Sequence, residues 1–219
     1  MAAIERHPSA PQADPGLIAA VRDIPVALLS DQLRRVRGSK GLIPYHRPAP
    51  LAGTAVTVRT RGGDNLAILR AYDHCRPGDV MVVDADGDVD NALVGGIMTF
   101  FAASIGLAGM VLDGAIRDVA EIRERPFPVY ARGVTHRGPY KDGPGAINVP
   151  VSVGGMTVNP GDIVTGDQDG LVAFSPDEAS AVIEKALRQR DAEEVTMQAI
   201  REGRWDRSFV DRLEARCAN

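Results

Sequence analysis

The spacing of apolar and polar residues along the chain predicts strands and helices in alternation. Residues 52–60 alternate small or apolar side chains with polar ones, at the two-residue period of a half-buried strand. Residues 65–74 place Leu66 and Leu69 at helical spacing, and the almost wholly apolar run at 80–83 is typical of a buried strand. We therefore predict a strand, helix and strand unit over this part of the chain.

The same pattern recurs immediately afterwards. Gly95 and Gly96 precede an apolar segment at residues 97–105 that predicts a helix, and Gly106 is placed to end that helix. Residues 109–113 then predict a further buried strand. Two successive units of this kind indicate that part of the sheet is parallel.

The second half of the chain changes character. A short helix is expected after Asp118, to about residue 125, followed by a strand at 128–132 and a loop at 136–145 rich in glycine and proline. Residues 147–174 read as short strands separated by turn dipeptides, which is typical of antiparallel structure. Ser-Pro-Asp-Glu then predicts the start of a long helix over 176–202.

The N-terminal residues read differently from the rest. Pro8, Pro11 and Pro15 among small polar residues predict a flexible arm over residues 1–16, and residues 17–219 are expected to form one domain. Two short helices with a break at Pro25 are expected over 17–36. The fold class is thus a single-domain α/β fold with mixed sheet.

Composition narrows the class of protein. A net charge of −4 leaves no cationic field for nucleic acid, so no nucleic-acid partner is expected. No apolar run approaches the roughly 20 residues of a membrane span, and the N-terminus lacks a basic start followed by an apolar stretch. We expect a cytoplasmic protein that makes no use of a membrane. Cys75 and Cys217 lack zinc or disulfide spacing and are expected to be free thiols.

Gly95 and Gly96 are the first candidate site residues. They precede a helix, so the amides of Gly96, Ile97 and Met98 have no partner within the helix and lie at the positive end of its dipole. Such a turn suits a carboxylate or phosphate ligand. Close packing of helix and strand is the alternative explanation for the two glycines.

Arg117 and Asp118 follow the end of the strand predicted at 109–113, where ligands gather in open α/β sheets. Arg117 offers a planar fork matched to a carboxylate, and Asp118 offers a hard oxygen to a divalent cation such as Mg²⁺. Together they suit an α-keto acid. The alternatives are structural: Asp118 and Glu121 fit a capping box, and Arg117 fits an ion pair with its neighbour.

Three further residues are candidates for supporting roles around the same site. Asp113 is placed to orient Arg117 or a metal-bound water, or to satisfy turn amides instead. Asn65 is placed to reach the same pocket, or to form a turn. His136 lies in the loop at 136–145, where a surface role is the alternative to a role in the site.

An ordered set of motifs carries a family resemblance over about residues 25–205: GGIMTFFAASIGLAGMVLDGAIRD, FPVYARG, GPGAIN, PVSVGG and PGDIVTGDQDGLV. The chain resembles the family that joins RraA-like proteins with 4-hydroxy-4-methyl-2-oxoglutarate/4-carboxy-4-hydroxy-2-oxoadipate aldolases. The resemblance implies an α/β/β swivelling-domain fold, assembly into homotrimers or hexamers, and an Mg²⁺ or Mn²⁺ site that stabilises pyruvate enolate.

The resemblance also assigns roles to residues. The arginine that grips the pyruvyl carboxylate matches Arg117, the metal aspartate matches Asp118, and the substrate loop matches residues 95–98. The aldolases have an acid as the second residue of that loop, whereas this chain has Gly96. Aldol cleavage must deprotonate a tertiary alcohol and is affected by this change, while oxaloacetate decarboxylation is expected to be affected less.

These observations together predict a class II, metal-dependent lyase. Its substrate would be a pyruvyl-containing keto acid, cleaved by 4-hydroxy-4-methyl-2-oxoglutarate-type aldol cleavage, by oxaloacetate decarboxylation, or by both, through a metal-stabilised pyruvate enolate. The alternative, from another class, is a non-enzymatic RraA-like regulator that binds ribonuclease E or another protein.

Overall fold

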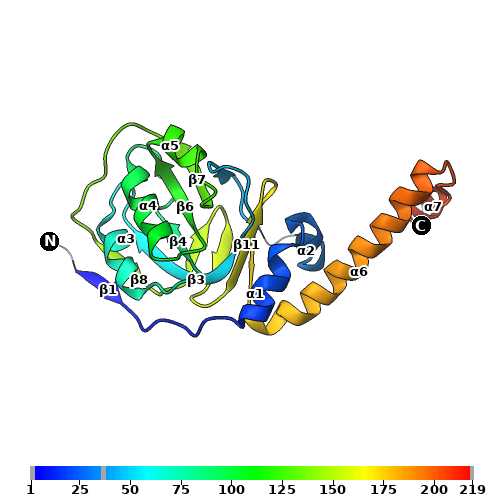
Figure 1. The fold of residues 1–219 in the computed structure, drawn as a ribbon, viewed down its shortest axis with the longest axis horizontal. Helices are drawn as coiled ribbons and strands as arrows, with labels where there is room; N and C mark the ends of the chain where they lie inside the picture. The colour runs from blue at the N-terminus through cyan, green and yellow to red at the C-terminus, as the bar shows by residue number, and fades with distance from the viewer. Residues whose placement is uncertain (1–2, 36–37, 218–219) are drawn as a thin grey trace.

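A mixed β-sheet forms the centre of the computed structural model, which describes residues 3–35 and 38–217 (Figure 1). Four strands run parallel in its middle, in the order β3 (Leu51–Thr60), β4 (Asp79–Asp84), β6 (Gly109–Ile116) and β7 (Val129–Val134). Every residue of β6 is buried, as expected for a strand covered on both faces. The predicted parallel core is confirmed.

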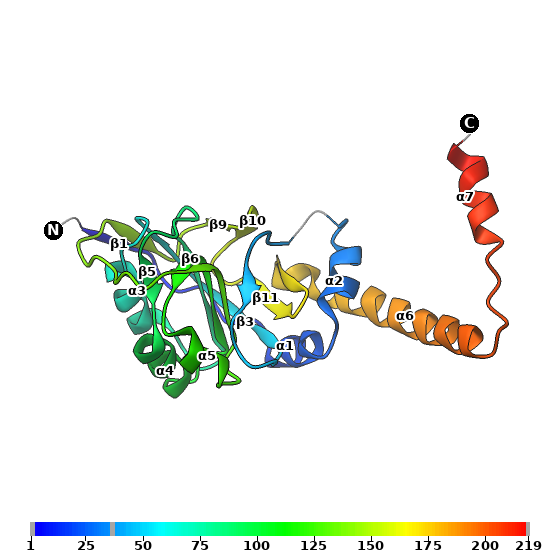
Figure 2. The same ribbon diagram turned by 90° about the horizontal axis from the view of Figure 1, so that it is seen from above.

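The two faces of the sheet are covered by different layers (Figure 2). One face carries α3 (Leu66–Ala71), the 3-10 turn η1 (Tyr72–His74), α4 (Gly96–Ser104) and α5 (Val119–Arg123). The other packs against the hairpin β9 (Val151–Val153) and β10 (Met156–Val158). The layers are therefore helix, sheet and sheet, which is the α/β/β arrangement expected.

Further strands extend the sheet and make it mixed. β8 (Gly145–Ile147) and β11 (Ile163–Asp167) pair antiparallel with β3, and β12 (Gly170–Phe174) pairs antiparallel with β11. β2 (Ile43–Pro44) lies antiparallel to β7, and β5 (Ala92–Val94) lies parallel to β6. The antiparallel second half of the chain is thus confirmed.

A third hydrophobic cluster joins the two N-terminal helices and the long C-terminal helix to β11 and β12. α1 (Pro15–Arg22) and α2 (Val26–Gln32) are separated at Pro25, as predicted. α6 (Pro176–Arg201) begins after Ser175, whose side chain accepts a hydrogen bond from the Asp177 amide at 3.2 Å. The predicted long helix is confirmed.

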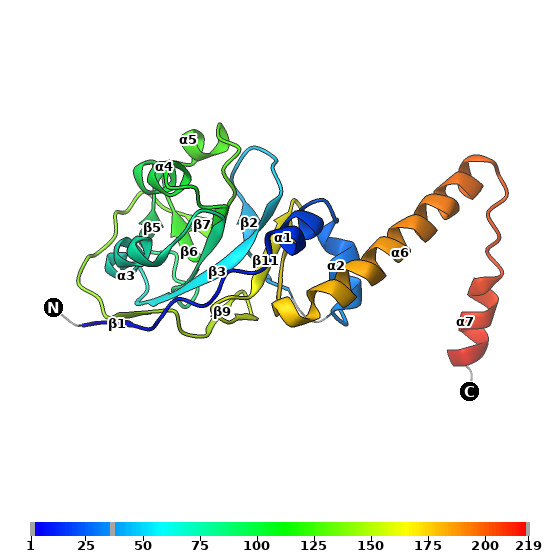
Figure 3. The same cartoon turned by 60° about the horizontal axis from the view of Figure 1, so that its bottom comes forward.

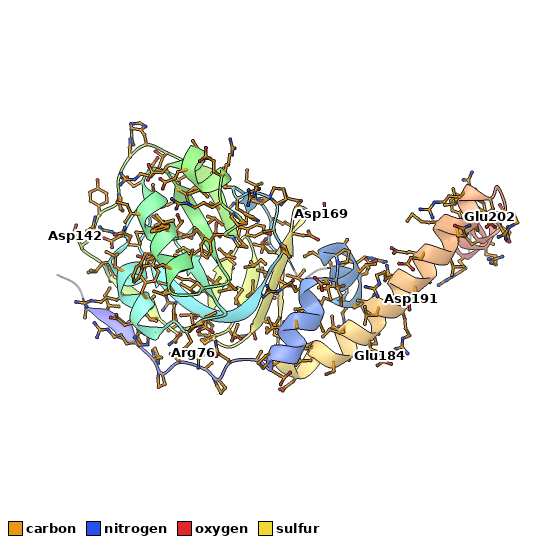
Figure 4. The ribbon with its side chains drawn as sticks, viewed as in Figure 1. Arg76, Asp142, Asp169, Glu184, Asp191 and Glu202 are labelled. Carbon is orange, nitrogen blue, oxygen red and sulfur yellow. The ribbon has the colours of Figure 1, made fainter. Side chains whose placement is uncertain are left out.

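The C-terminal half of α6 extends away from the sheet, and α7 (Phe209–Cys217) follows it (Figures 1 and 2). Glu184, Asp191 and Glu202 mark the course of α6 from near its start to just beyond its end (Figure 4). None of the helices in the described ranges is both long and apolar enough to cross a membrane.

The N-terminal segment differs from the flexible arm expected over residues 1–16. β1 (Ile4–Arg6) pairs parallel with β8, and the segment continues along the edge of the domain to α1 (Figure 3). The Ala13 amide donates to Thr54 Oγ1 at 3.0 Å, and Arg76 (labelled in Figure 4) donates to the Ala10 carbonyl at 2.8 Å. Composition missed this because main-chain pairing of β1 and hydrogen bonds to groups distant in sequence, rather than a run of apolar side chains, hold the segment in place.

Cys75 is a free thiol, as predicted. Its Sγ donates to the Ala71 carbonyl at 3.2 Å, and burial raises the pKa of the thiol to about 12, with a smaller contribution from Asp79. The side chain of Cys217 lies outside the described residues.

Asp64 anchors the loop at 136–145 to the sheet. Its carboxylate is fully buried and accepts hydrogen bonds from the amides of Leu66, Asp142 and Gly143 at 2.9, 2.7 and 3.0 Å. The guanidinium of Arg61 adds a fourth bond at 3.0 Å. One side chain thus joins the start of α3 to a loop nearly eighty residues later in sequence.

Replacing Asp64 by alanine should lower the free energy of unfolding by about 3 kcal/mol, because three main-chain amides lose their buried acceptor. Urea denaturation followed by circular dichroism measures this. Asp142→Ala is the matched control, since the Asp142 side chain is 69% exposed and lies 3.8 Å from Arg61. The control should change stability by less than about 0.5 kcal/mol. Equal midpoints for the two variants would contradict the anchoring role.

Candidate functional site

One cavity brings most of the predicted site residues together. It has a volume of about 270 Å³ and lies where β5 and β6 end, beside the N-terminus of α4 and the loop at 136–145. Its lining consists of Asn65, Leu69, Leu93, Val94, Gly95, Ile97, Met98, Arg117, Asp118, Pro139 and Lys141. A cavity therefore lies at the carboxyl ends of parallel strands, where the site was predicted.

Arg117 and Asp118 are positioned by the end of β6. The Arg117 amide donates to the Val94 carbonyl at 3.1 Å, which ties this corner to β5. Asp118 adopts φ 58° and ψ 36°, a left-handed conformation that an aspartate tolerates better than most residues. Such backbone strain gathers at functional sites, where the surrounding structure holds it in place.

The Asp118 side chain hydrogen-bonds to α4 rather than to α5, the helix that Asp118 precedes. Asp118 precedes α5 but makes no side-chain capping hydrogen bond there, so the capping-box alternative with Glu121 is wrong. Instead its Oδ2 accepts from the Gly96 amide at 2.9 Å. Among the described residues no group donates to Oδ1, so this oxygen is left for a ligand.

This contact corrects the expected anion site at the start of α4. The Gly96 amide is occupied by Asp118, and Gly96 does not line the cavity. The carboxylate at the positive end of the helix is thus the chain's own. Gly95 is needed for the approach, because a Cβ there would lie 2.3 Å from Asp118 Oδ2. Ile97 and Met98 line the cavity as predicted.

Arg117 forms the ion pair with Asp118 that the structural alternative predicts, but the contact is a long one. Its Nε lies 3.8 Å from Asp118 Oδ2, beyond hydrogen-bond distance, and its side chain is 45% exposed. Nη1 faces Gly138 of the loop, where a Cβ would lie 3.1 Å away. The planar edge of the guanidinium therefore remains available to a carboxylate in the cavity.

Asn65 contributes a buried oxygen that has no partner among the described residues. Its Nδ2 donates to the Leu93 carbonyl at 3.0 Å, while Oδ1 is buried and accepts no hydrogen bond. The Asn65 side chain makes no capping hydrogen bond to α3. An unsatisfied buried oxygen in a cavity wall costs stability unless a ligand or water supplies a donor or a cation.

Asp113 belongs to a different part of the molecule. β6 continues through Ile116, so Asp113 lies within the strand and not at its end. It accepts from the Gly154 amide at 2.6 Å and from the Nε of Arg132, and the Arg132 pKa is raised by this hydrogen bond. Asp113 therefore positions the β9–β10 hairpin, and the prediction that it supports Arg117 is wrong.

The loop contributes to the site through other residues than the one predicted. His136 is exposed and lies outside the cavity lining, whereas Pro139 and Lys141 of the same loop are part of it. The sequence indicated this loop, but His136 was the residue predicted, because a single lysine in a loop belongs to no motif that marks a function. Lys141 gives the cavity a second cation besides Arg117.

Tyr72 fixes the position of α4 at the cavity. Its hydroxyl donates to the Met98 carbonyl at 3.0 Å, and its ring meets Phe101 edge-on at 5.0 Å. Burial raises the Tyr72 pKa well above its usual value, so the group stays a neutral donor.

The oxygen donors present fit a divalent cation that keeps most of its water. The described residues contain no cluster of three or more His, Cys, Asp or Glu side chains able to hold a metal. The cavity lining instead contains Asp118, whose Oδ1 has no donor among the described residues, and Asn65, whose Oδ1 is buried without a partner there. Hard oxygen ligands, few in number, are what Mg²⁺ accepts while retaining waters.

Comparison with known proteins places the chain in a family. Residues 26–173 match the RraA-like family model, described as Aldolase/RraA. A putative 4-hydroxy-4-methyl-2-oxoglutarate aldolase of Halalkalibacterium halodurans is 38% identical over 190 residues, covering 86% of this chain and 90% of that protein. The 4-hydroxy-4-methyl-2-oxoglutarate aldolase of Thermus thermophilus is 36% identical over 134 residues, covering 61% and 80% respectively.

A solved structure gives the same result for the fold. Streptomyces coelicolor RraAS2, described as an unusual member of the RNase ES inhibitor RraA protein family, superposes with a TM-score of 0.79 at 27% identity. The match covers 86% of this chain and 98% of that one. The chain is thus similar in sequence to relatives named as aldolases and in fold to a member of a ribonuclease inhibitor family, and it belongs to the RraA-like, Aldolase/RraA family.

Proposed function

We propose that this protein is a divalent-metal-dependent lyase that cleaves a C–C bond of a pyruvyl-containing acid. The observation that carries the proposal is the cavity at the end of β6, where a free arginine edge lies beside an aspartate oxygen without a donor. Relatives named 4-hydroxy-4-methyl-2-oxoglutarate aldolase support this reaction class.

The two cations of the cavity fit an acid with two carboxylates. Arg117 would hold the pyruvyl carboxylate through two parallel N–H donors. Lys141, on the loop at 136–145, would meet the second carboxylate as a point charge. The cavity volume of about 270 Å³ suits a small organic acid.

Asp118 and Asn65 would hold the cation through their free oxygens. When bound, an Mg²⁺ or Mn²⁺ ion would polarise the α-carbonyl and so favour an enolate. Residues of the chain would bind the substrate and exclude water. Arg117 orients the carboxylate, and Leu93, Val94 and Met98 exclude water from one wall, which strengthens the electrostatic contacts within the cavity.

A protein-binding regulator is the second candidate. Ile97, Phe100 and Phe101 on α4 are 86, 61 and 47% exposed, which is the kind of apolar patch that protein partners cover. RraAS2, described as a member of a ribonuclease inhibitor family, shares the fold. This candidate leaves the unpartnered Asn65 oxygen and the free Asp118 oxygen without an explanation, so we place it second.

The proposed activity is tested by pyruvate release from oxaloacetate and from 4-hydroxy-4-methyl-2-oxoglutarate, each with Mg²⁺ and with EDTA. Metal-dependent release from at least one substrate is expected. No release from either substrate with any divalent cation would refute the lyase and favour the regulator.

Arg117→Lys should lower kcat/KM by about 100-fold, because an ammonium replaces only part of a bidentate contact. Steady-state kinetics with oxaloacetate measure the loss. Arg137→Lys is the matched control. Arg137 is exposed, belongs to the loop at 136–145 and does not line the cavity, so the activity of this variant should stay within about twofold of wild type. Near-normal turnover in Arg117→Lys would exclude the carboxylate role.

Asp118→Asn should abolish Mg²⁺-dependent turnover and lower the unfolding free energy by no more than about 1 kcal/mol, because an amide oxygen still accepts from Gly96. Thermal unfolding measures stability alongside the assay. Asp90→Ala is the control, since Asp90 is exposed and its hydrogen bonds with Asp88 and Thr135 use its main chain. A folded Asp118→Asn protein that kept metal-dependent activity would be inconsistent with the proposed cation ligand.

A further inference from the structure

Met98 places a thioether in the wall of the cavity. The residue lines the cavity, is half-buried, and packs part of its side chain against the core on the helical face of the sheet. Its carbonyl accepts a hydrogen bond from the Tyr72 hydroxyl at 3.0 Å, which fixes its main chain in the first turn of α4. The main chain therefore keeps this side chain at the cavity.

The sulfur of Met98 has a polar partner. Sδ accepts a hydrogen bond from Asn65 Nδ2 at 3.3 Å, and the same Nδ2 donates to the Leu93 carbonyl at 3.0 Å. Asn65 is 2% exposed, and its Oδ1 has no partner among the described residues. The thioether thus takes part in a polar contact between two residues of the cavity wall.

The other methionines of the described chain differ from Met98 in accessibility or in place. Met81, Met110 and Met156 are buried, so a reagent in solvent does not reach them in the folded protein. Met197 is 52% exposed on α6 and lies outside the cavity lining. Met98 is therefore the one methionine of the described residues that is both accessible and part of the cavity.

A thioether that is reached from solvent reacts with peroxides. The sulfur attacks one oxygen of hydrogen peroxide, the O–O bond breaks, an S–O bond forms, and the second oxygen leaves as water after proton transfer. The sulfur loses two electrons, and the peroxide gains them. The product, methionine sulfoxide, is polar and chiral at sulfur, and methionine sulfoxide reductases convert it back to methionine.

The contact with Asn65 determines which sulfoxide forms. A thioether sulfur has two lone pairs, and addition of oxygen to one or to the other gives opposite configurations at sulfur. The Asn65 amide occupies one lone pair of the Met98 sulfur. Oxygen therefore adds at the other lone pair, and a single epimer is expected.

We propose that Met98 is a site of reversible oxidation by peroxides, and that its sulfoxide, formed as one epimer, inhibits the binding of acidic substrates in the cavity. The effect on activity rests on the proposed lyase function, whereas the oxidation itself does not. The sulfoxide oxygen is a strong acceptor in the cavity that contains Arg117 and Lys141. It competes with the substrate carboxylates for these two cations and takes up room in a cavity of about 270 Å³.

The test treats the whole protein with hydrogen peroxide and follows each methionine by peptide mass spectrometry. Met98 and Met197 should gain one oxygen atom, whereas the buried Met81, Met110 and Met156 should not. As Met98 is oxidised, kcat/KM for oxaloacetate should fall about tenfold, the loss expected when a hydrogen bond to a charged group is weakened. The change should lie mostly in KM, because the sulfoxide competes with substrate binding.

Two matched variants assign the effect to one sulfur. Met98→Leu keeps an apolar side chain of similar volume without the sulfur, and peroxide should leave it at its own untreated activity. Met197→Leu should match wild type before treatment and lose activity on treatment as the wild type does. A loss in treated Met98→Leu as large as that of wild type would overturn the inhibitory role of the Met98 sulfoxide.

The configuration is read with the two methionine sulfoxide reductases, each of which acts on one epimer. One of them should restore both Met98 and the activity, and the other should restore neither. At the exposed Met197, each enzyme should reduce part of the sulfoxide. In Asn65→Ala, which lacks the amide on the sulfur, each enzyme should also reduce part of the Met98 sulfoxide.

The outcomes are distinguishable. No activity of the untreated wild type on oxaloacetate or 4-hydroxy-4-methyl-2-oxoglutarate refutes the proposed function, while the peptide masses and the reductases still decide the oxidation of Met98. Met98 that stays unoxidised at a dose that oxidises Met197 fully, or equal reduction of its sulfoxide by both enzymes, overturns the inference. Oxidation of Met98 to one epimer, with a reversible loss of activity that is absent from Met98→Leu, supports it.

Discussion

The contact on which the site depends is the hydrogen bond from the Gly96 amide to the Asp118 carboxylate. It satisfies one of the free amides at the start of α4 and places a carboxylate at the positive end of that helix. It also fixes the corner at which β6 becomes α5, including the left-handed backbone of Asp118. This hydrogen bond requires glycine at position 95, because any side chain there would collide with Asp118. With Oδ2 held in this way, Oδ1 is presented to the cavity as a fixed acceptor.

The rest of the fold supports this corner. β6 is buried along its whole length between β4 and β7, so its end cannot shift without disturbing the sheet. The loop that carries Lys141 is held by the buried carboxylate of Asp64. Tyr72 fixes α4 from behind through the Met98 carbonyl. The cavity is thus assembled from segments far apart in sequence, each held by a buried polar contact.

The sequence predicted the layers well because they follow from periodic patterns. The parallel strands, the break at Pro25 and the start of α6 at Ser175 each have a local physical signal. Arg117 and Asp118 were found because strand ends gather ligands. The N-terminal strand was missed, because its pairing with β8 uses main-chain groups that leave no side-chain pattern.

Other errors share one cause. Asp113 was assigned to the site because the strand was predicted to end there. The strand runs three residues further, and Asp113 lies on the same face as Val111, toward the β9–β10 hairpin. Glu121 was considered only as part of a capping box, since local spacing cannot reveal that its carboxylate lies over Gly96. Contacts between elements distant in sequence decide which of two roles a polar residue takes.

The most direct measurement of the central claim is a crystal structure of the protein soaked with Mn²⁺ and oxalate, a mimic of pyruvate enolate, with anomalous data collected for manganese. The account predicts an anomalous peak at coordination distance from Asp118 Oδ1, about 2.2 Å, with an oxalate carboxylate paired to the Arg117 guanidinium. A structure at high Mn²⁺ and oxalate concentrations with no peak beside Asp118, or with oxalate bound away from Arg117, would contradict it.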